Sequence, residues 1–437
     1  MSKKVVGKNI KKVDAKDKVT GQAPYTRDIN FEDMLYVKVK RATRPHAYLR
    51  KLDVSQAEQL AGVVKIITAK DYPDLNNFGL IIKDQPVLID IGDKMRFMGD
   101  VLAIVIAKTE EIATKALELI EVEVEELEII TDPLEAMEED VPAIHEAESE
   151  LISEYLDNNI SSNNILCDHY LKKGDVEEGF SQADLIVENE YKTQHIDQVP
   201  LQVEAGVGLY DEETGLIKIW AATQWLHDTQ ADIAQSIGLP KEKVRIIQPT
   251  IGGAFGKKED ISVHIHLALA AMEVKQPVKF SYTREESMIS QSKRHPMTIR
   301  HKTGVTNEGY LTAWQTEVIG DVGAYASSSP AVVHKSLYHC TGPYNVENVK
   351  GVSYAVYTNN TYTGAMRGFG ATQMGFAYDS QIDIIAEKLG MDPFEFRLQN
   401  TYQLGSTTPN GQVLTKSVNV KRTIQEVKDM SKRGDDR

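Results

Sequence analysis

Short apolar runs separated by polar turns dominate the first 150 residues of the chain. Three of these runs predict buried strands, at residues 34–39, 63–67 and 101–107. Residues 121–125 alternate strictly between glutamate and valine, which predicts a strand with one solvated face. The apolar residues after Thr109 keep helical spacing, so a capped helix is expected before that strand. This mixture predicts a compact α+β unit over residues 1–150.

The pattern changes after this unit. Residues 151–172 are rich in glutamate, serine and asparagine, and this composition predicts a linker or an exposed excursion. Strand and helix patterns then resume in mixed order, so residues 173–425 are predicted to form a second and larger domain. The polar residues 426–437 predict a loose tail.

Two glycine-rich turns stand out in the second domain. The first turn, within residues 249–260, contains Gly252-Gly253-Ala254-Phe255-Gly256. The second turn, within residues 364–373, contains Gly364-Ala365-Met366-Arg367-Gly368-Phe369-Gly370. Each follows an apolar run that predicts a strand and precedes a helical run, at residues 262–273 and 372–389.

A glycine turn at the start of a helix leaves backbone N–H groups bare, and such a place favours an anion. The first turn is not a P-loop, because Lys257 is followed by Lys258 and not by serine or threonine. The two turns fit either of two interpretations. They are unrelated tight turns, or they hold one anionic ligand from two sides, with each phenylalanine screening it from water.

Composition and charge exclude several classes of function. The chain has 437 residues, a formal charge of −15 and a pI of about 5.3, whereas nucleic-acid-binding proteins are expected to show a basic face. No run of about 20 apolar residues predicts a membrane span, and the lysine-rich start is not a signal peptide. Cys167 and Cys340 are far apart and predict neither an iron–sulfur cluster nor a disulfide framework in this chain. A cytoplasmic protein is expected.

The sequence offers no self-contained nucleophile or metal cage. It contains neither His-Glu-x-x-His nor Gly-x-Ser-x-Gly. His264 and His266 are two residues apart on a predicted helix, so they point in different directions and make a poor metal pair. Any chemistry is therefore expected to depend on a bound cofactor.

The two turns resemble the cofactor loops of the xanthine dehydrogenase and aldehyde oxidase family of molybdenum hydroxylases. The resemblance covers nearly the whole chain. Further matches to the family lie in both domains, at Asp14, Lys18-Val19-Thr20-Gly21, Tyr25, Pro45-His46-Ala47, Arg96-Phe97-Met98-Gly99-Asp100, Thr223-Gln224, Arg294-His295-Pro296 and Gly323-Ala324-Tyr325. The implied fold is α+β, with an α/β hammerhead domain followed by the first part of a molybdenum-cofactor-binding domain.

The resemblance also implies that the subunit is split. The family's molybdenum subunit is usually longer, and its second half supplies a Gly-Val-Gly-Glu segment whose glutamate is the catalytic base. That segment is missing from this sequence. A partner chain, a second molybdopterin subunit, is therefore expected to carry the base, and further partners are expected to carry FAD and [2Fe-2S] clusters.

The resemblance assigns roles residue by residue. The implied cofactor-binding residues, which carry no side-chain metal ligand, are Gln224, Gly253, Ala254, Phe255, Gly256, Arg367, Gly368 and Phe369. Three of them, Gln224, Phe255 and Arg367, are expected beside the metal. Catalytic roles are implied for Gln224, Arg367 and Glu259. Substrate contacts are implied for Glu259, Lys335 and Phe369.

Some positions depart from the family pattern or have a simpler interpretation. Glu204 is not followed by the usual proline. Lys257 replaces a usual glycine, so it is expected to add bulk and charge near the cofactor or to meet a phosphate. Glu259 also fits a helix-start carboxylate, and Lys335 also fits a solvated lysine.

By resemblance, the chain is a molybdopterin-binding subunit that hydroxylates an N-heteroaromatic substrate, nicotinate-like or purine, with oxygen from water. The molybdenum–molybdopterin cofactor is expected in its cytosine dinucleotide form. Two alternatives remain: a subunit of an aldehyde oxidoreductase, and a non-catalytic paralogue that binds cofactor or partner.

Overall fold

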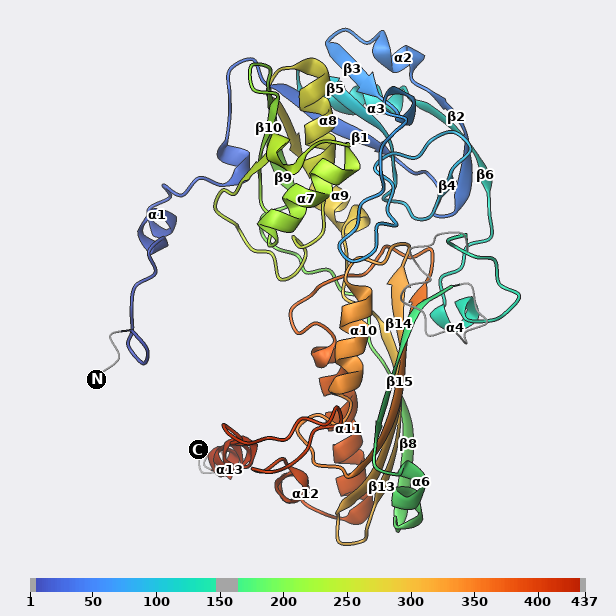
Figure 1. The fold of residues 1–437 in the computed structure, drawn as a ribbon, viewed down its shortest axis with the longest axis vertical. Helices are drawn as coiled ribbons and strands as arrows, with labels where there is room; N and C mark the ends of the chain where they lie inside the picture. Colours follow the sequence, from blue (N-terminus) through green and yellow to red (C-terminus); the bar gives the residue numbers. More distant parts are fainter. Residues whose placement is uncertain (1–4, 147–163, 433–437) are drawn as a thin grey trace.

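The computed structural model describes residues 5–146 and 164–432, which form two lobes stacked along the long axis of the molecule (Figure 1). One lobe is built on a seven-stranded and a three-stranded sheet, and the other on a five-stranded sheet. The N-terminal residues extend away from the first lobe (Figure 1), and their helix α1 (Ala15–Val19) has no buried residue. None of the described helices has the length and apolar character needed to span a bilayer.

The seven-stranded sheet combines strands from both sequence domains. Its order is β11-β10-β9-β12-β1-β5-β3. The strands are β1 (Leu35–Arg41), β3 (Val63–Ile67), β5 (Val101–Ala107), β9 (Ala205–Asp211), β10 (Leu216–Ala221), β11 (Val244–Ile247) and β12 (Val278–Ser281). β1 and β12 pair in parallel, with Leu35 opposite Val278. The two sequence domains therefore share one sheet.

Apolar sequence explains why this sheet is the core of its lobe. Every residue of β5 is buried. The helix α8 (His264–Val274) is buried along its first two turns and packs on β9 and β10. The prediction of a Thr109 cap is confirmed, since Ile112 N donates to Thr109 Oγ1 at 3.3 Å at the start of α3 (Glu110–Glu118).

A smaller sheet and short helices complete the first lobe. The three-stranded sheet has the order β4-β2-β6. Its strands are β2 (Ala47–Asp53), β4 (Lys94–Met95) and β6 (Glu121–Glu126). The other helical elements of this lobe are η1 (Thr26–Asp28), α2 (Ser55–Glu58), η2 (Ala69–Asp71), α7 (Leu226–Ser236), η3 (Lys241–Lys243) and α9 (Arg284–Ser290). The helix α4 (Pro133–Ala136) packs instead on the five-stranded sheet of the other lobe.

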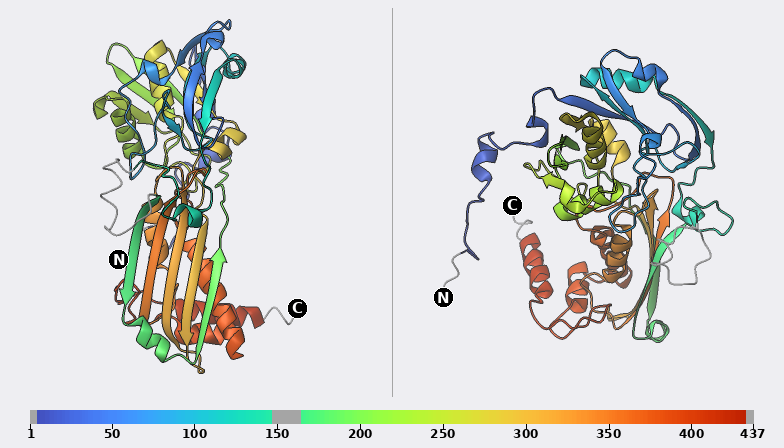
Figure 2. Two further views of the ribbon diagram at one scale, coloured as in Figure 1. Left: turned by 90° about the vertical axis from the view of Figure 1, so that its right-hand side faces the viewer. Right: turned by 45° about the horizontal axis from the view of Figure 1, so that its top comes forward.

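The second lobe is a five-stranded sheet with helices on one face. The order is β7-β15-β14-β13-β8. The strands are β7 (Ile165–Lys173), β8 (Leu185–Lys192), β13 (Met297–Val305), β14 (Leu311–Gly323) and β15 (Asn348–Tyr357). The helices α10 (Ser329–Tyr338) and α11 (Ala371–Leu389) pack on it, and the opposite face is open to the viewer in Figure 2, left. The short helices are α6 (Val176–Ser181), α12 (Pro393–Asn400) and α13 (Val420–Lys432).

Two boundary predictions are wrong. Within the predicted linker 151–172, the described part is strand β7, which pairs with β15 and buries Leu171; residues 151–163 lie outside the described residues. Within the predicted tail 426–437, the described part continues α13, where Lys428 pairs with Asp392 and Glu395; residues 433–437 lie outside the described residues. Tertiary pairing, which composition does not report, orders both segments.

Candidate functional site

The two glycine turns meet where the lobes join. The Arg367 N–H donates to the Phe255 carbonyl at 2.9 Å. A Cβ atom on Gly256 would lie 2.2 Å from the Ala365 carbonyl oxygen, so only glycine fits between the turns. The Gln198 amide, on the segment before β9, also donates to Ala365 O at 2.8 Å. The two turns are therefore in direct contact, which is the arrangement that a ligand held from two sides requires.

Both turns use the same unusual backbone conformation. Phe255 has φ of 58° and is followed by Gly256 at 105°; Phe369 has φ of 52° and is followed by Gly370 at 91°. A positive φ in a phenylalanine is a strained conformation that folded proteins retain mostly at functional sites. Phe255 is 49% exposed, so packing does not explain its conformation.

The turns differ in their relation to a helix. Gly370 is the N-cap of α11, so the second turn opens a helix as predicted. The first turn does not, because α8 begins only at His264, and that part of the prediction is wrong. Its N–H groups are nevertheless bare: among the described residues, Gly253, Ala254 and Phe255 donate to no acceptor. Three successive N–H groups without an acceptor are available to an anion, even though no helix begins here.

Gln224 is fixed to the first turn from three sides. Its side-chain Oε1 accepts from Gly256 N at 3.0 Å, and its backbone N–H donates to Lys258 O at 2.7 Å. Its Nε2 donates to Glu259 Oε1 at 3.4 Å. Gln224, Gly256 and Glu259, which the sequence singled out separately, therefore form one cluster.

Three buried lysines support the first turn. Lys257 is fully buried, and its Nζ lies 2.8 and 2.7 Å from the two carboxylate oxygens of Asp197. Lys293 joins the same carboxylate at 3.0 Å. Lys258 donates to the carbonyl of Gly253 at 2.7 Å. The prediction that Lys257 adds charge to the ligand side or meets a phosphate is wrong, since its ammonium points into the interior.

Arg294 supports the second turn. Its guanidinium donates to Arg367 O at 2.9 Å and to Thr372 Oγ1 at 2.6 Å. The side chain of Arg367 itself is exposed and makes no hydrogen bond within the described residues. Its backbone is fixed while its guanidinium remains available for an anion.

Lys335 and Phe369 lie together. The Lys335 ammonium is 5.8 Å from the centre of the Phe369 ring, within reach of a cation–π contact. Lys335 is half-buried near the end of α10, so it is not a freely solvated lysine. The pair offers a positive charge next to a flat apolar surface.

Glu259 has an altered acidity. Burial, and then the neighbouring Asp260, raise the pKa of Glu259 to about 7. Near neutral pH this carboxyl group is therefore present in both protonation states, and it can donate or accept a hydrogen bond. It does not cap α8, which rules out the helix-start interpretation.

Sequence reasoning missed Asp197, Lys293 and Gln198. One signal was available: a lysine inside a tight glycine turn is hard to keep solvated and needs a buried carboxylate. Nothing in the local sequence identifies Asp197 as that carboxylate, 60 residues away. Within the described residues, no cluster of three or more histidine, cysteine or acidic side chains could hold a metal ion, so a metal here would have to arrive with its own ligand. The bare N–H groups and the free Arg367 fit an anionic cofactor of that kind.

Two family models match the chain. The model "Aldehyde oxidase and xanthine dehydrogenase, a/b hammerhead domain" matches residues 20–128. The model "Molybdopterin cofactor-binding domain" matches residues 157–401 and so includes both glycine turns.

Among curated proteins, the chain is 43% identical over 425 residues to the nicotinate dehydrogenase large molybdopterin subunit of Eubacterium barkeri, and the match covers 97% of this chain and 96% of that protein. It is 32% identical over 414 residues to the xanthine dehydrogenase molybdenum-binding subunit of Escherichia coli O157:H7, covering 91% of this chain and 52% of that one. The solved aldehyde oxidoreductase of Desulfovibrio desulfuricans superposes with a TM-score of 0.89 at 27% identity, over 98% of this chain and 47% of that one. The chain thus spans nearly all of the first relative and about half of the other two.

Proposed function

Because the chain belongs to the molybdopterin-binding subunits of the xanthine dehydrogenase and aldehyde oxidase family, we propose that it hydroxylates an N-heteroaromatic ring, nicotinate-like or purine, with oxygen from water. The observation that carries the proposal is the contact between two strained Phe-Gly turns, with bare N–H groups on one and a free guanidinium on the other. Its 43% identity over nearly the full length of a nicotinate dehydrogenase subunit supports a nicotinate-like ring over the alternatives.

We assign cofactor binding to both turns. Gly253, Ala254 and Phe255 offer N–H groups to the anionic part of the cofactor, and Arg367 offers a cation. Gly256, Gly368 and Phe369 keep the turns close enough to act on one ligand. Gln224 presents its amide group at the cofactor side of the first turn. The bound molybdenum cofactor, proposed in its cytosine dinucleotide form, supplies the electron acceptor and the activation of water.

We assign substrate binding to Glu259, Lys335 and Phe369. Phe369 offers a face for a flat ring, and the Lys335 ammonium beside it attracts a ring carboxylate. Glu259, with a pKa near 7, can hydrogen-bond a ring nitrogen in either protonation state. This combination favours an anionic heteroaromatic ring over a neutral aldehyde.

Partner chains complete the proposed site. We place the catalytic base, a glutamate, on a second molybdopterin subunit, and FAD and [2Fe-2S] clusters on further subunits of a cytoplasmic complex. The apolar rim supports a docked partner here: Trp225 is 43% and Phe255 49% exposed beside the first turn. Aromatic side chains of this kind are enriched where protein partners dock.

The deciding experiment is elemental analysis of the chain purified natively with the subunits that co-elute. About one molybdenum per chain, with turnover of nicotinate or a purine, is expected. An intact complex without molybdenum would contradict the proposal and favour the non-catalytic alternative.

Substrate class is tested with Lys335→Ala in the same complex. The variant should raise KM for nicotinate much more than KM for a neutral purine, because only nicotinate carries the carboxylate. An equal effect on both substrates, or activity on aldehydes alone, would contradict the assignment.

A further inference from the structure

A small cavity borders Glu259 at the end of the first turn. Its volume is about 10 Å3, close to the minimum that holds one water molecule. Four carboxylate side chains are among its lining residues, which are Phe78, Gly79, Leu80, Asp84, Gln85, Asp232, Glu259, Asp260, Ile261 and Ser327. It is therefore a polar cavity that reaches from Glu259 into the interior.

Two of these carboxylates each leave one buried oxygen without a partner. Asp84 is 9% exposed; its Oδ2 accepts from Ala326 N at 2.7 Å and from the Tyr357 hydroxyl at 2.8 Å, but its Oδ1 has no partner among the described residues. Asp260 Oδ1 accepts from Ser327 Oγ at 2.5 Å; its Oδ2 is likewise buried and lacks a hydrogen bond of good geometry, with the Ser292 side chain beside the carboxyl group. Buried acceptors without partners are costly, so a water between them is the expected solution.

Asp100 shows that an unpaired oxygen is not a general feature of buried aspartates here. Asp100 is also buried and also binds a tyrosine, Tyr325, at 2.7 Å through Oδ1. Its Oδ2, unlike Asp84 Oδ1, accepts from Arg96 N at 2.7 Å. Asp84 thus differs from Asp100 in two respects: one of its oxygens has no partner, and it lines the small cavity.

A glycine lies next to each unpaired oxygen. A Cβ on Gly364, the first residue of the second turn, would lie 2.9 Å from Asp260 Oδ2. A Cβ on Gly79 would lie 3.5 Å from Asp84 Oδ1. Asp260 therefore sits against both glycine turns and also borders the small cavity.

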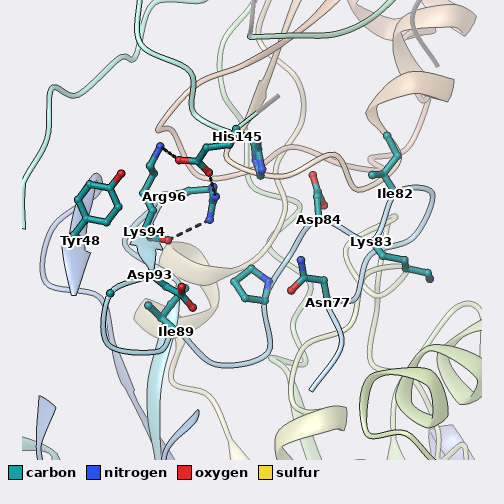
Figure 3. A pocket seen from close by; sticks show the side chains of 13 residues that line it. Tyr48, Asn77, Ile82, Lys83, Asp84, Ile89, Asp93, Lys94, Arg96 and His145 are labelled. Atoms are coloured by element: carbon teal, nitrogen blue, oxygen red, sulfur yellow. Dashed lines mark hydrogen bonds and ion pairs between the residues drawn. The ribbon is translucent and has the colours of Figure 1, made fainter. Parts of the chain in front are cut away.

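Asp84 also lines a second and much larger pocket of about 460 Å3, shown in Figure 3. Its side chain extends toward that pocket, where Asn77, Lys94, Arg96 and His145 are also drawn. The pocket lies where strands of the first lobe meet the loops 324–327, since His145 bonds Ala324 O at 2.8 Å. Asp84 thus lines both the small cavity and the larger pocket.

We propose that a water bridges Asp84 Oδ1 and Asp260 Oδ2, and that Glu259, Asp260, this water and Asp84 form a route by which protons leave the cofactor site for the larger pocket. The route rests on the proposed function. Hydroxylation converts R–H and H2O into R–OH, two protons and two electrons; the electrons pass to the molybdenum cofactor and its partner redox groups, so two protons must leave. A docked partner would close the direct way to solvent.

The acidities of the carboxyl groups suit such a route. Burial raises the pKa of Asp84 to about 7 and that of Glu259 to about 7, and it raises the pKa of Asp260 as well. The charged groups that face them are Arg96, which opposes the shift at Asp84, and Asp232, which adds to the shift at Asp260. Asp232 is ion-paired with Lys83, so it is not a free member of the route. Groups that exchange protons near neutral pH relay them efficiently.

The first test needs no activity. A high-resolution crystal structure of the native complex should show one water within hydrogen-bonding distance of both Asp84 Oδ1 and Asp260 Oδ2. An empty cavity, or a side chain filling it, would overturn the proposal even in an active enzyme.

The second test follows protons in the reconstituted complex. Product formation and proton release are measured together in a single turnover with a pH-indicator dye, for the wild type and for Asp84→Asn, Asp260→Asn and Asp100→Asn. We expect Asp84→Asn and Asp260→Asn to delay proton release behind product by about tenfold or more. Asp100→Asn, which touches neither cavity, should match the wild type.

The outcomes separate the two proposals. Product with prompt proton release in both Asp84→Asn and Asp260→Asn would overturn the proton route and leave the proposed function intact. No product from nicotinate or purines in a molybdenum-loaded wild type would contradict the proposed function, and the water would still be tested by the crystal structure. Each asparagine keeps the oxygen that accepts the existing hydrogen bonds, so both variants are expected to fold, and either one alone tests the route.

Discussion

The two glycine turns share a backbone but differ in their supports. After the Phe-Gly pair, the first turn continues Lys257-Lys258-Glu259 and the second Ala371-Thr372-Gln373. Buried ion pairs hold the first turn. The second turn is held by the start of α11 and by hydrogen bonds from Arg294 to uncharged oxygen atoms of the turn. The same local conformation is thus produced in two ways, and only the first way relies on buried ion pairs.

Removing the buried charge should have the largest effect. Lys257→Met keeps the volume but leaves Asp197 with Lys293 alone, and the free energy of unfolding should fall by about 3–5 kcal/mol. Denaturant unfolding of the chain measures it. Lys275→Met, which breaks the exposed pair with Glu212, should cost less than about 1 kcal/mol. Equal costs for the two variants would show that the first turn does not depend on its buried ion pair.

Forcing the turns apart should have the next largest effect. Gly256→Ala adds a contact at 2.2 Å with Ala365 O to the strain of a φ of +105°. We expect a loss of about 2–4 kcal/mol, and loss of molybdenum from the native complex. Gly411→Ala is the matched control, since its φ is +86° with nothing within 4 Å, so strain alone should cost about 1 kcal/mol. If both variants lost the same stability, the contact between the turns would be irrelevant.

A milder change tests the second turn. Arg294→Lys cannot keep the contacts with both Arg367 O and Thr372 Oγ1, so a loss of about 1–2 kcal/mol is expected, with faster hydrogen exchange at Gly368. Arg300→Lys on the exposed sheet face changes a surface pair with Glu190 and should cost less than about 1 kcal/mol. Slow exchange retained at Gly368 in Arg294→Lys would assign the support to α11 instead.

A pH dependence tests the titratable group of the first turn. Glu259 and Gln373 are each the third residue after the Phe-Gly pair of their turn, so Glu259→Gln gives the first turn the residue of the second. The pKa of Glu259 is about 7 when folded and 4.5 as an ordinary glutamate, so the folded protein binds the extra proton between these values. The contribution of Glu259 to stability is therefore present below pH 4.5 and is lost as the pH rises through 7. Unfolding free energies should show the variant gaining on the wild type from pH 4.5 to 8; a constant difference would contradict the shift.

Sequence periodicity predicted the local elements well. Residues 63–67 and 101–107 form β3 and β5 with the predicted bounds, because a buried strand needs a continuous apolar run. The linker and tail predictions failed because pairing of β7 with β15 and packing of α13 on α12 are decided by distant residues.

The site was only half visible in the sequence. Glycine and phenylalanine marked the turns, since a positive φ restricts residue choice. The supports are different: Asp197 beneath Lys257, and Asp84 behind Asp260, lie far away in the chain and carry no local signature. A buried carboxylate is specified by what surrounds it in space, and spacing along the chain does not report that.

The shared seven-stranded sheet has a consequence for synthesis on the ribosome. One edge of β1 (Leu35–Arg41) pairs with β5, which is synthesised soon afterwards. Its other edge pairs with β12 (Val278–Ser281), which is synthesised much later. The nascent chain therefore carries an open apolar edge through more than half of its translation, and such edges recruit other strands. The hammerhead segment cannot complete its folding first and wait for the rest, so chaperone protection of nascent chains should matter more for this protein than for one whose domains form in succession.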